Sequence, residues 1–294
     1  MKVTTAVITA AGFGTRMLPA TSAIQKVMLP ILNRPVVDYI VDDCLAAGVT
    51  NIIFVINPGT HDLQDYYTGN PSLERLMKHF GKKDALEMLA KVHNKATFTF
   101  VEQTFESVGY GTNPPLVVAA PHLPKNEAFL FTYGDAWLRQ PGGKSVYVDM
   151  VKTFNETVAD GVVAGLELPQ AELHRYGVLG IKEKDDHEYL DRLVEKPASG
   201  QEPSNLANLG FYIFKPSIMQ YVRDVKKNEH GEYFLTDAVE AAAKDHLLAI
   251  HRTNGDFLDA GNLKNWFRTN LEVAATNPDL AEVLSQYANF VTKQ

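Results

Sequence analysis

The first residues that could carry chemistry follow an apolar run near the start of the chain. The run "VTTAVITAA" ends in a loop that joins small residues to a cation, Ala11, Gly12, Gly14, Thr15 and Arg16, and Lys26 follows in a segment pinned by two prolines. Glycines allow a backbone to approach a ligand closely, and the amide groups of such a loop point at an anion. Arginine can grip a di- or triphosphate bidentately, whereas lysine acts as a compact point charge. The combination favours a nucleoside triphosphate.

Two known glycine-loop templates do not fit this stretch. The loop lacks the third glycine of a dinucleotide fingerprint, and it lacks the Gly-Lys-Ser/Thr ending of a P-loop. A Gly-x-Gly loop alone could merely turn a corner, and a single cation alone could be a solvated surface charge. Two cations attached to a glycine loop after the first strand favour a phosphate site instead.

The elements that must position this loop alternate in type. Residues 3–11 and 51–57 have the composition of buried strands, and "PVVDYIVDDCLAAGV" between them has helical spacing. Strand, crossover helix and strand form a βαβ unit, and near-continuous apolar strands belong to a sheet buried on both faces. We therefore predict an α/β fold with a Rossmann-like, mostly parallel mixed sheet flanked by helices, whose carboxyl edge carries the loop.

The rest of the chain continues the α/β pattern. Residues 61–95 predict two charged amphipathic helices on either side of Gly81, interpreted as a solvated insert rather than a partner-binding surface. Asn113 is expected to cap a helix that opens with a proline. Further strands are predicted at 96–103, 127–135, 161–168 and 206–214, a hairpin at 176–197, a helix at 234–245, and a strand pair at 246–262 before a C-terminal helix.

Composition limits the function classes. The chain has 294 residues, 45% of them hydrophobic and 21% charged, which predicts a soluble globular protein. A formal charge of −7 argues against broad nucleic-acid binding, which needs a net-positive surface. The single cysteine, Cys44, is expected to be a half-buried packing residue and fits a reducing compartment. Because no signal peptide and no apolar run of membrane-spanning length is found, we expect a cytoplasmic protein without a membrane partner.

A family resemblance then emerges from the motifs. The stretch "AAGFGTRMLPATSAIQKVMLPILNRP" resembles the signature of sugar-1-phosphate nucleotidylyltransferases, and "RMLPAT" is similar to the bacterial-type UTP-glucose-1-phosphate uridylyltransferases. Further matches recur in the family's order: "VEQ", "GYG", "GD", "YGV", "VEKP", "SNLANLGFYIF", "LTDA" and "DAGN". They cover residues 3 to about 275, and many ordered matches are far more specific than one.

The resemblance implies an enzyme that joins the phosphate oxygen of glucose 1-phosphate to the α-phosphorus of UTP and expels pyrophosphate. In this in-line displacement the protein mainly holds two anions and neutralises their repulsion with cations and Mg²⁺. We expect one domain over residues 1–294, with a nucleotide-binding half at about 1–140, a sugar-phosphate half at about 141–270 and a helical segment at about 271–294. A homodimer or homotetramer is also implied, although core packing explains the same apolar helical pattern.

The resemblance also implies roles for the phosphate and nucleotide residues. Arg16 stabilises the leaving pyrophosphate, and Lys26 and Lys196 neutralise the reacting phosphates. Gln103 can pair a donor and an acceptor with the uracil edge, and two glycines make room for the planar ring. The implied nucleotide site comprises Ala11, Gly12, Gly14, Thr15, Gln103, Gly109, Gly111 and Asp135.

The metal and the sugar are assigned to other positions. Mg²⁺ prefers one or two carboxylates together with waters and phosphates, and Asp135 ends a strand at the edge that carries the glycine loop. Asp259 is the second ligand by resemblance, although an aspartate before a helix is usually an N-cap. The implied sugar site is Gly177, Glu195 and Asn208, although "EKP" is otherwise a common surface turn. Glu195 and Lys196 should lie on opposite faces if the strand persists.

Three departures from the family pattern leave alternatives open. Gln25 and Val27 replace a proline and a glutamate, and because Lys26 is kept we expect catalysis to be unharmed. Thr112-Asn113-Pro114-Pro115 replaces a segment beside the nucleotide, so a dTTP-using thymidylyltransferase stays an alternative. Phe211 replaces an arginine and is expected to alter the acceptor side or a subunit contact. A catalytically silent regulatory homologue is a further alternative, although retention of the charged site residues argues against it.

Overall fold

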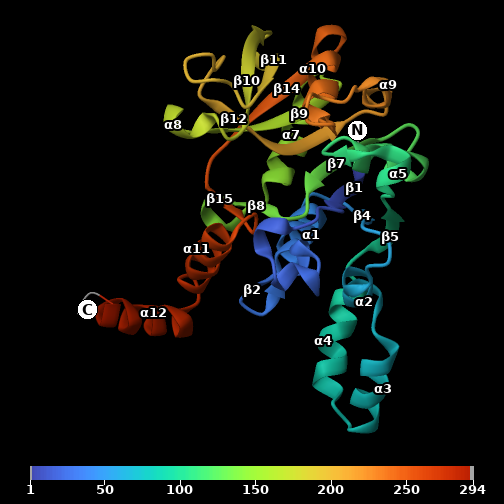
Figure 1. Ribbon diagram of the computed structural model, residues 1–294, viewed down its shortest axis with the longest axis vertical. Coiled ribbons are helices and arrows are strands. Elements are labelled where there is room, and N and C mark those ends of the chain that lie inside the picture. Colours follow the sequence, from blue (N-terminus) through green and yellow to red (C-terminus); the bar gives the residue numbers. More distant parts are fainter. Residues whose placement is uncertain (1, 292–294) are drawn as a thin grey trace.

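A computed structural model describes residues 2–291, and Figure 1 shows the arrangement of its elements. Within this range the centre is a nine-stranded sheet with the order β10-β11-β14-β9-β12-β7-β1-β4-β5. Its strands are β1 Val3–Ala10, β4 Asn51–Ile56, β5 Thr97–Glu102, β7 Ala128–Tyr133, β9 Gly161–Glu167, β10 Gly177–Lys184, β11 His187–Glu195, β12 Leu206–Phe214 and β14 Leu248–Thr253. The predicted α/β class is confirmed.

The first half of the sheet is parallel. Strand β1 pairs in parallel with both β4 and β7, and β4 pairs in parallel with β5. Helix α1 (Val36–Ala46) makes the crossover from β1 to β4, so the predicted βαβ unit is confirmed. Because β4 and β5 lie on one side of β1 and β7 lies on the other, the strand order reverses beside β1. Open α/β sheets bind ligands at such a reversal.

The second half of the sheet is mixed. Strand β12 runs antiparallel to β7 and β9, whereas β14 runs parallel to β9. Strands β10 and β11 form the predicted hairpin, and its turn residues Asp185 and Asp186 have φ values of 51° and 60°. The two strands predicted at 246–262 are present as β14 and β15 (Asp256–Asp259), but they do not pair with each other. Strand β15 pairs instead with β8 (Ala136–Arg139).

Two helical layers cover the sheet, and alternate strand residues face each layer. Ala6 and Ile8 of β1 pack in one core cluster with α1 and α7 (Val146–Glu156), whereas Val7 packs in another with α6 (Pro114–Ala119), α9 (Ile218–Asp224) and α10 (Leu235–Asp245). This burial on both faces explains the near-continuous apolar strands. Cys44 is fully buried on α1 rather than half-buried, and burial raises the pKa of its thiol.

The predicted insert projects from the sheet between β4 and β5 (Figure 1). It contains α2 (Asp62–Thr68), α3 (Pro71–His79) and α4 (Lys83–His93), so the two helices around Gly81 are confirmed and α2 precedes them. At the other end of the chain α11 (Leu263–Ala274) and α12 (Pro278–Val291) lead away from the sheet. Short elements complete the described chain: η1 Thr15–Met17, η2 Ala20–Ser22, η3 Lys26–Met28, β2 Pro30–Ile31, β3 Arg34–Pro35, α5 Phe105–Val108, β6 Tyr110–Gly111, η4 Ala120–His122, η5 Pro141–Gly143, α8 Gln170–Leu173 and β13 Glu232–Tyr233.

One local prediction is wrong. Asn113 occupies the N-cap position of α6, but its side chain makes no cap hydrogen bond. Its Nδ2 instead donates to the carbonyl oxygen of Val222 at 2.9 Å, because the residue is buried against α9. The division of the chain into nucleotide-binding and sugar-phosphate halves stays a prediction. Among residues 2–291, no helix has the length and apolar character needed to cross a membrane.

Candidate active site

A cavity of about 230 Å³ lies at the carboxyl ends of β1, β5 and β7, beside the reversal of the strand order. Five of the predicted site residues line it: Ala11, Gly12, Lys26, Gln103 and Gly111. The remaining wall is Thr9, Tyr110, Thr112, Pro115, Tyr133, Glu232 and Phe234. Gly12 and Lys26 also line a neighbouring polar cavity of about 310 Å³. The glycine loop therefore separates two hollows, as a phosphate-binding loop could.

The glycine loop turns sharply at Gly14, whose φ is 63°. A Cβ there would lie 3.0 Å from Thr21 Cγ2, and the Gly14 carbonyl accepts hydrogen bonds from Met17 N and Thr21 Oγ1, each 2.8 Å long. Gly12 differs, since a Cβ there would meet no atom within 4 Å. A side chain at Gly12 would therefore extend into open space beside the cavities.

Lys26 and Asp135 meet although different parts of the chain supply them. Lys26 begins η3, Asp135 follows β7, and Lys26 Nζ forms an ion pair with Asp135 Oδ2. The two side chains are 22% and 23% exposed, so solvent and a ligand can both reach the pair. The predicted phosphate cation and the predicted metal carboxylate therefore share one site.

Arg16 and Thr15 lie apart from this pair. Both are exposed on η1, and within the described part of the chain Arg16 makes no ion pair or hydrogen bond and lines neither cavity. The role of Arg16 at the leaving pyrophosphate therefore stays a prediction.

Asp135 and Asp259 fit a divalent metal by the chemistry of their donors. Their backbones adjoin, because Ala260 N donates to the Asp135 carbonyl at 3.0 Å and Asp259 pairs with Ala136. Asp259 is not the N-cap of α11, since Asn262 holds that position; its carboxylate instead accepts from Gly261 N and Asn265 Nδ2. Such outer hydrogen bonds orient a ligating carboxylate.

The metal site would need further ligands. Across residues 2–291, no three acidic, histidine or cysteine side chains gather as a metal-binding group. Mg²⁺ commonly takes one or two protein carboxylates and completes its octahedron with waters and substrate phosphates. Asp135 reaches the cavity through its ion pair with Lys26, whereas Asp259 lines a separate cavity with Tyr176 and Asn265, so a shared metal site stays a prediction.

Gln103 supplies an unpaired acceptor. The side chain is 2% exposed, its Nε2 donates to the Gly109 carbonyl at 3.2 Å, and its Oε1 is buried with no partner in the described residues. A buried unpaired carbonyl oxygen favours a ligand that brings a donor. Because the Gln103 Nε2 carries a second N–H that is not used in the bond to Gly109, the expectation that Gln103 offers a base both a donor and an acceptor stays a prediction.

Gly109 and Gly111 are explained by packing. A Cβ at Gly111 would lie 2.2 Å from the Tyr233 carbonyl oxygen, and one at Gly109 would lie 2.6 Å from the Tyr233 ring. Strand β6 pairs in parallel with β13 at this place. The glycines make room primarily for β13, and of the two only Gly111 lines the cavity.

The side-chain ends of Glu195 and Lys196 approach each other, and the strand does not persist as the prediction of opposite faces required. Strand β11 ends at Glu195, and Lys196 has a φ of 45°, so the alternation stops there. Lys196 Nζ then lies 3.9 Å from Glu195 Oε1 and 5.6 Å from the centre of the Phe234 ring. Burial raises the pKa of Glu195 in spite of the opposing charge of Lys196. Gly177 lies directly opposite Glu195 in the β10–β11 ladder, where a Cβ would approach Glu195 Oε2 to 3.1 Å.

Asn208 and Phe211 are engaged inside the protein. The Asn208 amide donates to the Tyr212 hydroxyl at 2.6 Å and accepts from Gly210 N at 3.1 Å. Phe211 is fully buried against Tyr147 and Phe257, with ring centres 5.5 and 6.2 Å apart. Because Phe211 is buried within the chain, it could alter a subunit contact only indirectly, and both expectations for this residue stay predictions.

The segment that departs from the family pattern touches the cavity at two of its four positions. Thr112 and Pro115 line the cavity, whereas Asn113 and Pro114 are buried behind it. Thr112 Oγ1 accepts a hydrogen bond from Leu235 N at the start of α10, 2.9 Å long. The departure is thus partly structural, because it joins the cavity wall to a helix from the second half of the chain.

Aromatic residues at the cavity were missed by sequence reasoning. Tyr133 is half-buried in the wall, and desolvation raises the pKa of its hydroxyl, as do the nearby charges of Glu195 and Asp135. Phe13 in the glycine loop stacks on Tyr110, with ring centres 5.1 Å apart. Tyr133 directly precedes the "GD" motif, and Phe13 lies inside the loop, so adjacency to motif residues was the available signal.

Comparisons with known proteins point to one family. Residues 5–276 match the Nucleotidyl transferase family. The chain is 32% identical over 283 residues to the UTP–glucose-1-phosphate uridylyltransferase of Staphylococcus haemolyticus, covering 96% of each chain. It is also 32% identical over 286 residues to the protein of that name from Bacillus subtilis, covering 96% of this chain and 95% of the relative. A crystal structure of UDP-glucose pyrophosphorylase complexed with UDP-glucose is similar with a TM-score of 0.82 and 25% identity, covering 94% of this chain and 100% of that one.

Proposed function

The chain belongs to the nucleotidyl transferase family, and on that premise we propose that it transfers a uridylyl group from UTP to glucose 1-phosphate, giving UDP-glucose and pyrophosphate. The observation that carries the proposal is one cavity at the reversal of the strand order, which combines the Lys26–Asp135 ion pair with the unpaired acceptor of Gln103. A nucleotide presents both complementary features, an anionic phosphate chain and a base with an N–H group.

The acceptor of Gln103 supports a particular class of base. Uracil and thymine carry a donor at N3, whereas cytosine carries an acceptor there, so Gln103 Oε1 would pair with the first two and repel the third. An unpaired buried acceptor costs about 1–3 kcal/mol, which corresponds to a discrimination of roughly 10- to 100-fold. Because uracil and thymine differ only at C5, this feature does not distinguish UTP from dTTP.

The phosphate chain would meet the cations in turn. We place the α-phosphate near Lys26, because this lysine lies at the cavity and is already held by Asp135. Arg16, exposed on the solvent side, is assigned to the departing pyrophosphate. Fixed cations at positions where charge develops lower the barrier of phosphoryl-type transfer without a covalent intermediate.

The acceptor sugar is assigned to the region beside the cavity next to Phe234, because the predicted sugar residues do not themselves line the cavity. Glu195 would accept hydrogen bonds from sugar hydroxyls, with Gly177 opposite it leaving space for the ring. Lys196, 59% exposed and close to Phe234, would hold the sugar phosphate. Asn208 would have to release its bond to Tyr212 to reach the sugar, so we assign it a supporting role in the wall.

We propose that a divalent metal ion, Mg²⁺, binds Asp135 and Asp259 together with the substrate phosphates. When bound, the ion would neutralise phosphate charge and polarise the α-phosphate. Its binding would compete with Lys26 for Asp135, which would free the Lys26 ammonium for the nucleotide.

A pyrophosphate-release assay over a matrix of nucleoside triphosphates and sugar 1-phosphates, with and without Mg²⁺, tests the proposal. We expect turnover with UTP and glucose 1-phosphate, weak or no turnover with CTP, and dependence on the metal. Release with dTTP but not UTP would overturn the base assignment. Silence with every pair would favour the regulatory homologue over the enzyme.

A further inference from the structure

Asp62 clamps the residue that precedes Lys26. Its Oδ2 accepts a hydrogen bond of 2.7 Å from Gln25 N, and its Oδ1 accepts one of 2.6 Å from Gln25 Nε2. Gln25 is 7% exposed and Asp62 is half-buried, and both residues line the polar cavity of about 310 Å³ that adjoins the candidate site. A carboxylate that accepts two hydrogen bonds from one residue restrains both its backbone and its side chain.

The clamp acts on the turn that presents Lys26. Gln25 is the N-cap residue of η3, and its carbonyl accepts from Met28 N at 2.9 Å. Lys26 follows immediately, and its Nζ pairs with Asp135. Fixing Gln25 therefore fixes the origin of the Lys26 side chain relative to the cavity.

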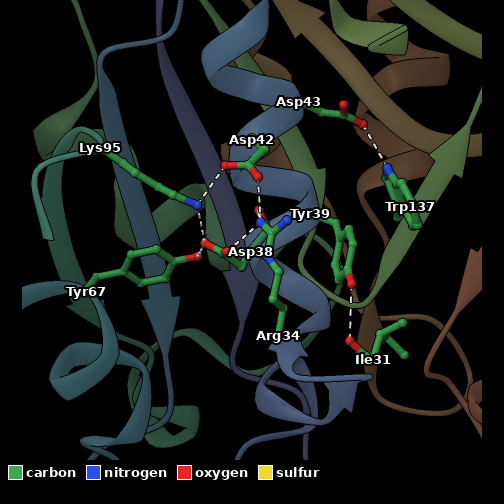
Figure 2. A network of polar contacts seen from close by, with 9 residues as sticks. All are labelled: Ile31, Arg34, Asp38, Tyr39, Asp42, Asp43, Tyr67, Lys95 and Trp137. Carbon is green, nitrogen blue, oxygen red and sulfur yellow. Dashed lines mark hydrogen bonds and ion pairs between the residues drawn. The ribbon is translucent and has the colours of Figure 1, made fainter. Parts of the chain in front are cut away.

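The helix that carries Asp62 is itself anchored. Asp62 begins α2, and Tyr67 in its last turn is fully buried and donates from its hydroxyl to Asp38 Oδ1 at 3.2 Å. Figure 2 shows Asp38 on α1 also bound by Arg34 and Lys95. Helix α2 is thus held to α1 at one end and holds Gln25 at the other.

We propose that Asp62 is a positioning residue for Lys26, an inference that rests on the proposed function and deepens it. The contact depends on this chain's own sequence. Gln25 stands where the resembling family has a proline, which offers neither an N–H nor a side-chain amide. The sequence expectation that this replacement leaves catalysis unharmed is explained if Gln25 and Asp62 together restrain the turn in place of the proline ring.

The test exchanges the side-chain donor and acceptor between positions 25 and 62 in the full-length enzyme. Q25E sets two carboxylates against each other and should lower kcat with UTP by about 10- to 100-fold, since misplacement of a reacting group by about 1 Å costs that much. Adding D62N restores a donor opposite the new carboxylate, so Q25E/D62N should recover to within about threefold of wild type. D62A removes the clamp without repulsion and should reproduce the loss. D62N alone should be mild, because the Gln25 amide can flip to face it.

Control variants separate positioning from charge and folding. Asp65 lies on the same helix, is exposed and does not touch Gln25, so D65N should neither lower activity nor rescue Q25E. The KM for glucose 1-phosphate should stay within about twofold of wild type in every variant, because neither Gln25 nor Asp62 lines the cavity beside which the sugar is placed. Assays are run at a temperature where circular dichroism shows each variant folded.

The outcomes distinguish this inference from the proposed function. If wild type does not turn over UTP with glucose 1-phosphate, the proposed function fails first. If wild type is active and D62A keeps kcat within about twofold, Asp62 does not position Lys26. Failure of D62N to rescue Q25E would equally overturn the inference, because the loss would then arise outside the clamp.

Discussion

At the scale of single residues, the orientation and pairing of the side chains in the candidate site depend on partners that are distant in the sequence. Lys26 on η3 becomes a fixed cation because Asp135, at the end of β7, faces it. Gln103 presents an unpaired Oε1 because its Nε2 is held by the Gly109 carbonyl. In both cases the sequence shows the residue type, whereas the groups that the residue offers to a ligand depend on its neighbour in the fold.

Replacing Asp135 by asparagine should remove most activity and leave the fold intact. The variant loses the negative charge that holds Lys26 and that would bind the metal, so we expect kcat to fall by about 100-fold or more. Steady-state pyrophosphate release measures the loss, and thermal unfolding checks the fold. D256N, on the adjoining strand β15 and 52% exposed, should behave like wild type. Near-normal turnover of D135N would refute the metal assignment.

Replacing Gln103 by methionine should raise the KM for UTP. The change keeps the volume but removes the acceptor, so kcat/KM for UTP should fall by roughly 10- to 100-fold while the KM for glucose 1-phosphate stays the same. Gln140 provides a matched control, because it is also buried, donates once, to Thr253 Oγ1, and keeps an unpaired Oε1 away from the cavity. An equal loss of kcat/KM in Q140M would show that the effect is general destabilisation.

At the scale of elements, helix α1 carries two aspartates with opposite electrostatics. Burial would raise the pKa of Asp38, but hydrogen bonds and charges from Lys95 and Arg34 outweigh it and hold this pKa below its usual value. Asp43, one turn further, has no such cation, and burial raises its pKa to about 7 although Trp137 Nε1 donates to it at 2.9 Å (Figure 2). The ionised carboxylate of Asp38 therefore stabilises the folded protein, whereas ionisation of the Asp43 carboxylate would destabilise it.

The Asp43 carboxylate makes stability depend on pH in a defined window. Below pH 3.8 the group is protonated in both states; between 3.8 and about 7 the unfolded chain releases the proton and the folded protein retains it, so stability falls as pH rises. D43N keeps an acceptor for Trp137 and removes this loss. We expect the free energy of unfolding of D43N relative to wild type to grow from pH 4 to pH 7 by a few kcal/mol. Urea denaturation at several pH values measures it, and a constant difference would contradict the assignment.

Removal of Asp38 should destabilise the junction between α1 and α2. D38A leaves Arg34 and Lys95 without their buried partner and Tyr67 without its acceptor, so we expect a loss of about 3 kcal/mol in unfolding free energy. Asp42 binds the same two cations but is 43% exposed, and D42A should cost less than about 1 kcal/mol. Denaturant unfolding of both variants tests the contrast; equal losses would argue against the dominant role of Asp38.

At the scale of the whole molecule, the helices that leave the sheet present apolar surface. On α11 the side chains of Leu263, Phe267 and Leu271 are 65%, 56% and 39% exposed and recur at every fourth position, so they form one stripe. Exposed apolar stripes commonly mark contacts between chains. The predicted homodimer or homotetramer could use this surface.

We expect light scattering after size exclusion to give a multiple of 32.6 kDa. The substitution F267E should shift the mass towards the monomer, because it places a charge in the centre of the stripe. T276E, on the exposed turn after α11, adds the same charge outside the stripe and should leave the mass unchanged. A monomeric wild type at micromolar concentration would contradict the oligomer prediction.

Much of the architecture could be predicted because it depends on local patterns. The βαβ unit, the hairpin around Asp185 and the helices around Gly81 follow from periodicity and turn residues over short stretches. The same patterns predicted that Asp135 would lie at the sheet edge that carries the glycine loop, since the carboxyl ends of parallel strands lie together, whereas the family resemblance assigned Gln103 to the nucleotide site.

Only the tertiary structure decided which side chains meet. The chain by itself determined the α/β class and the residue types at the edge. It did not determine that β15 would pair with β8, that Lys196 would turn back to Glu195, or that Asp62 would clamp Gln25. No periodic pattern in the sequence predicts these contacts. Each depends on a local backbone conformation, or on the position of a helix or strand, that is fixed by the packing of the whole core. The site therefore needs both the local sequence, which supplies the groups, and the fold, which pairs them.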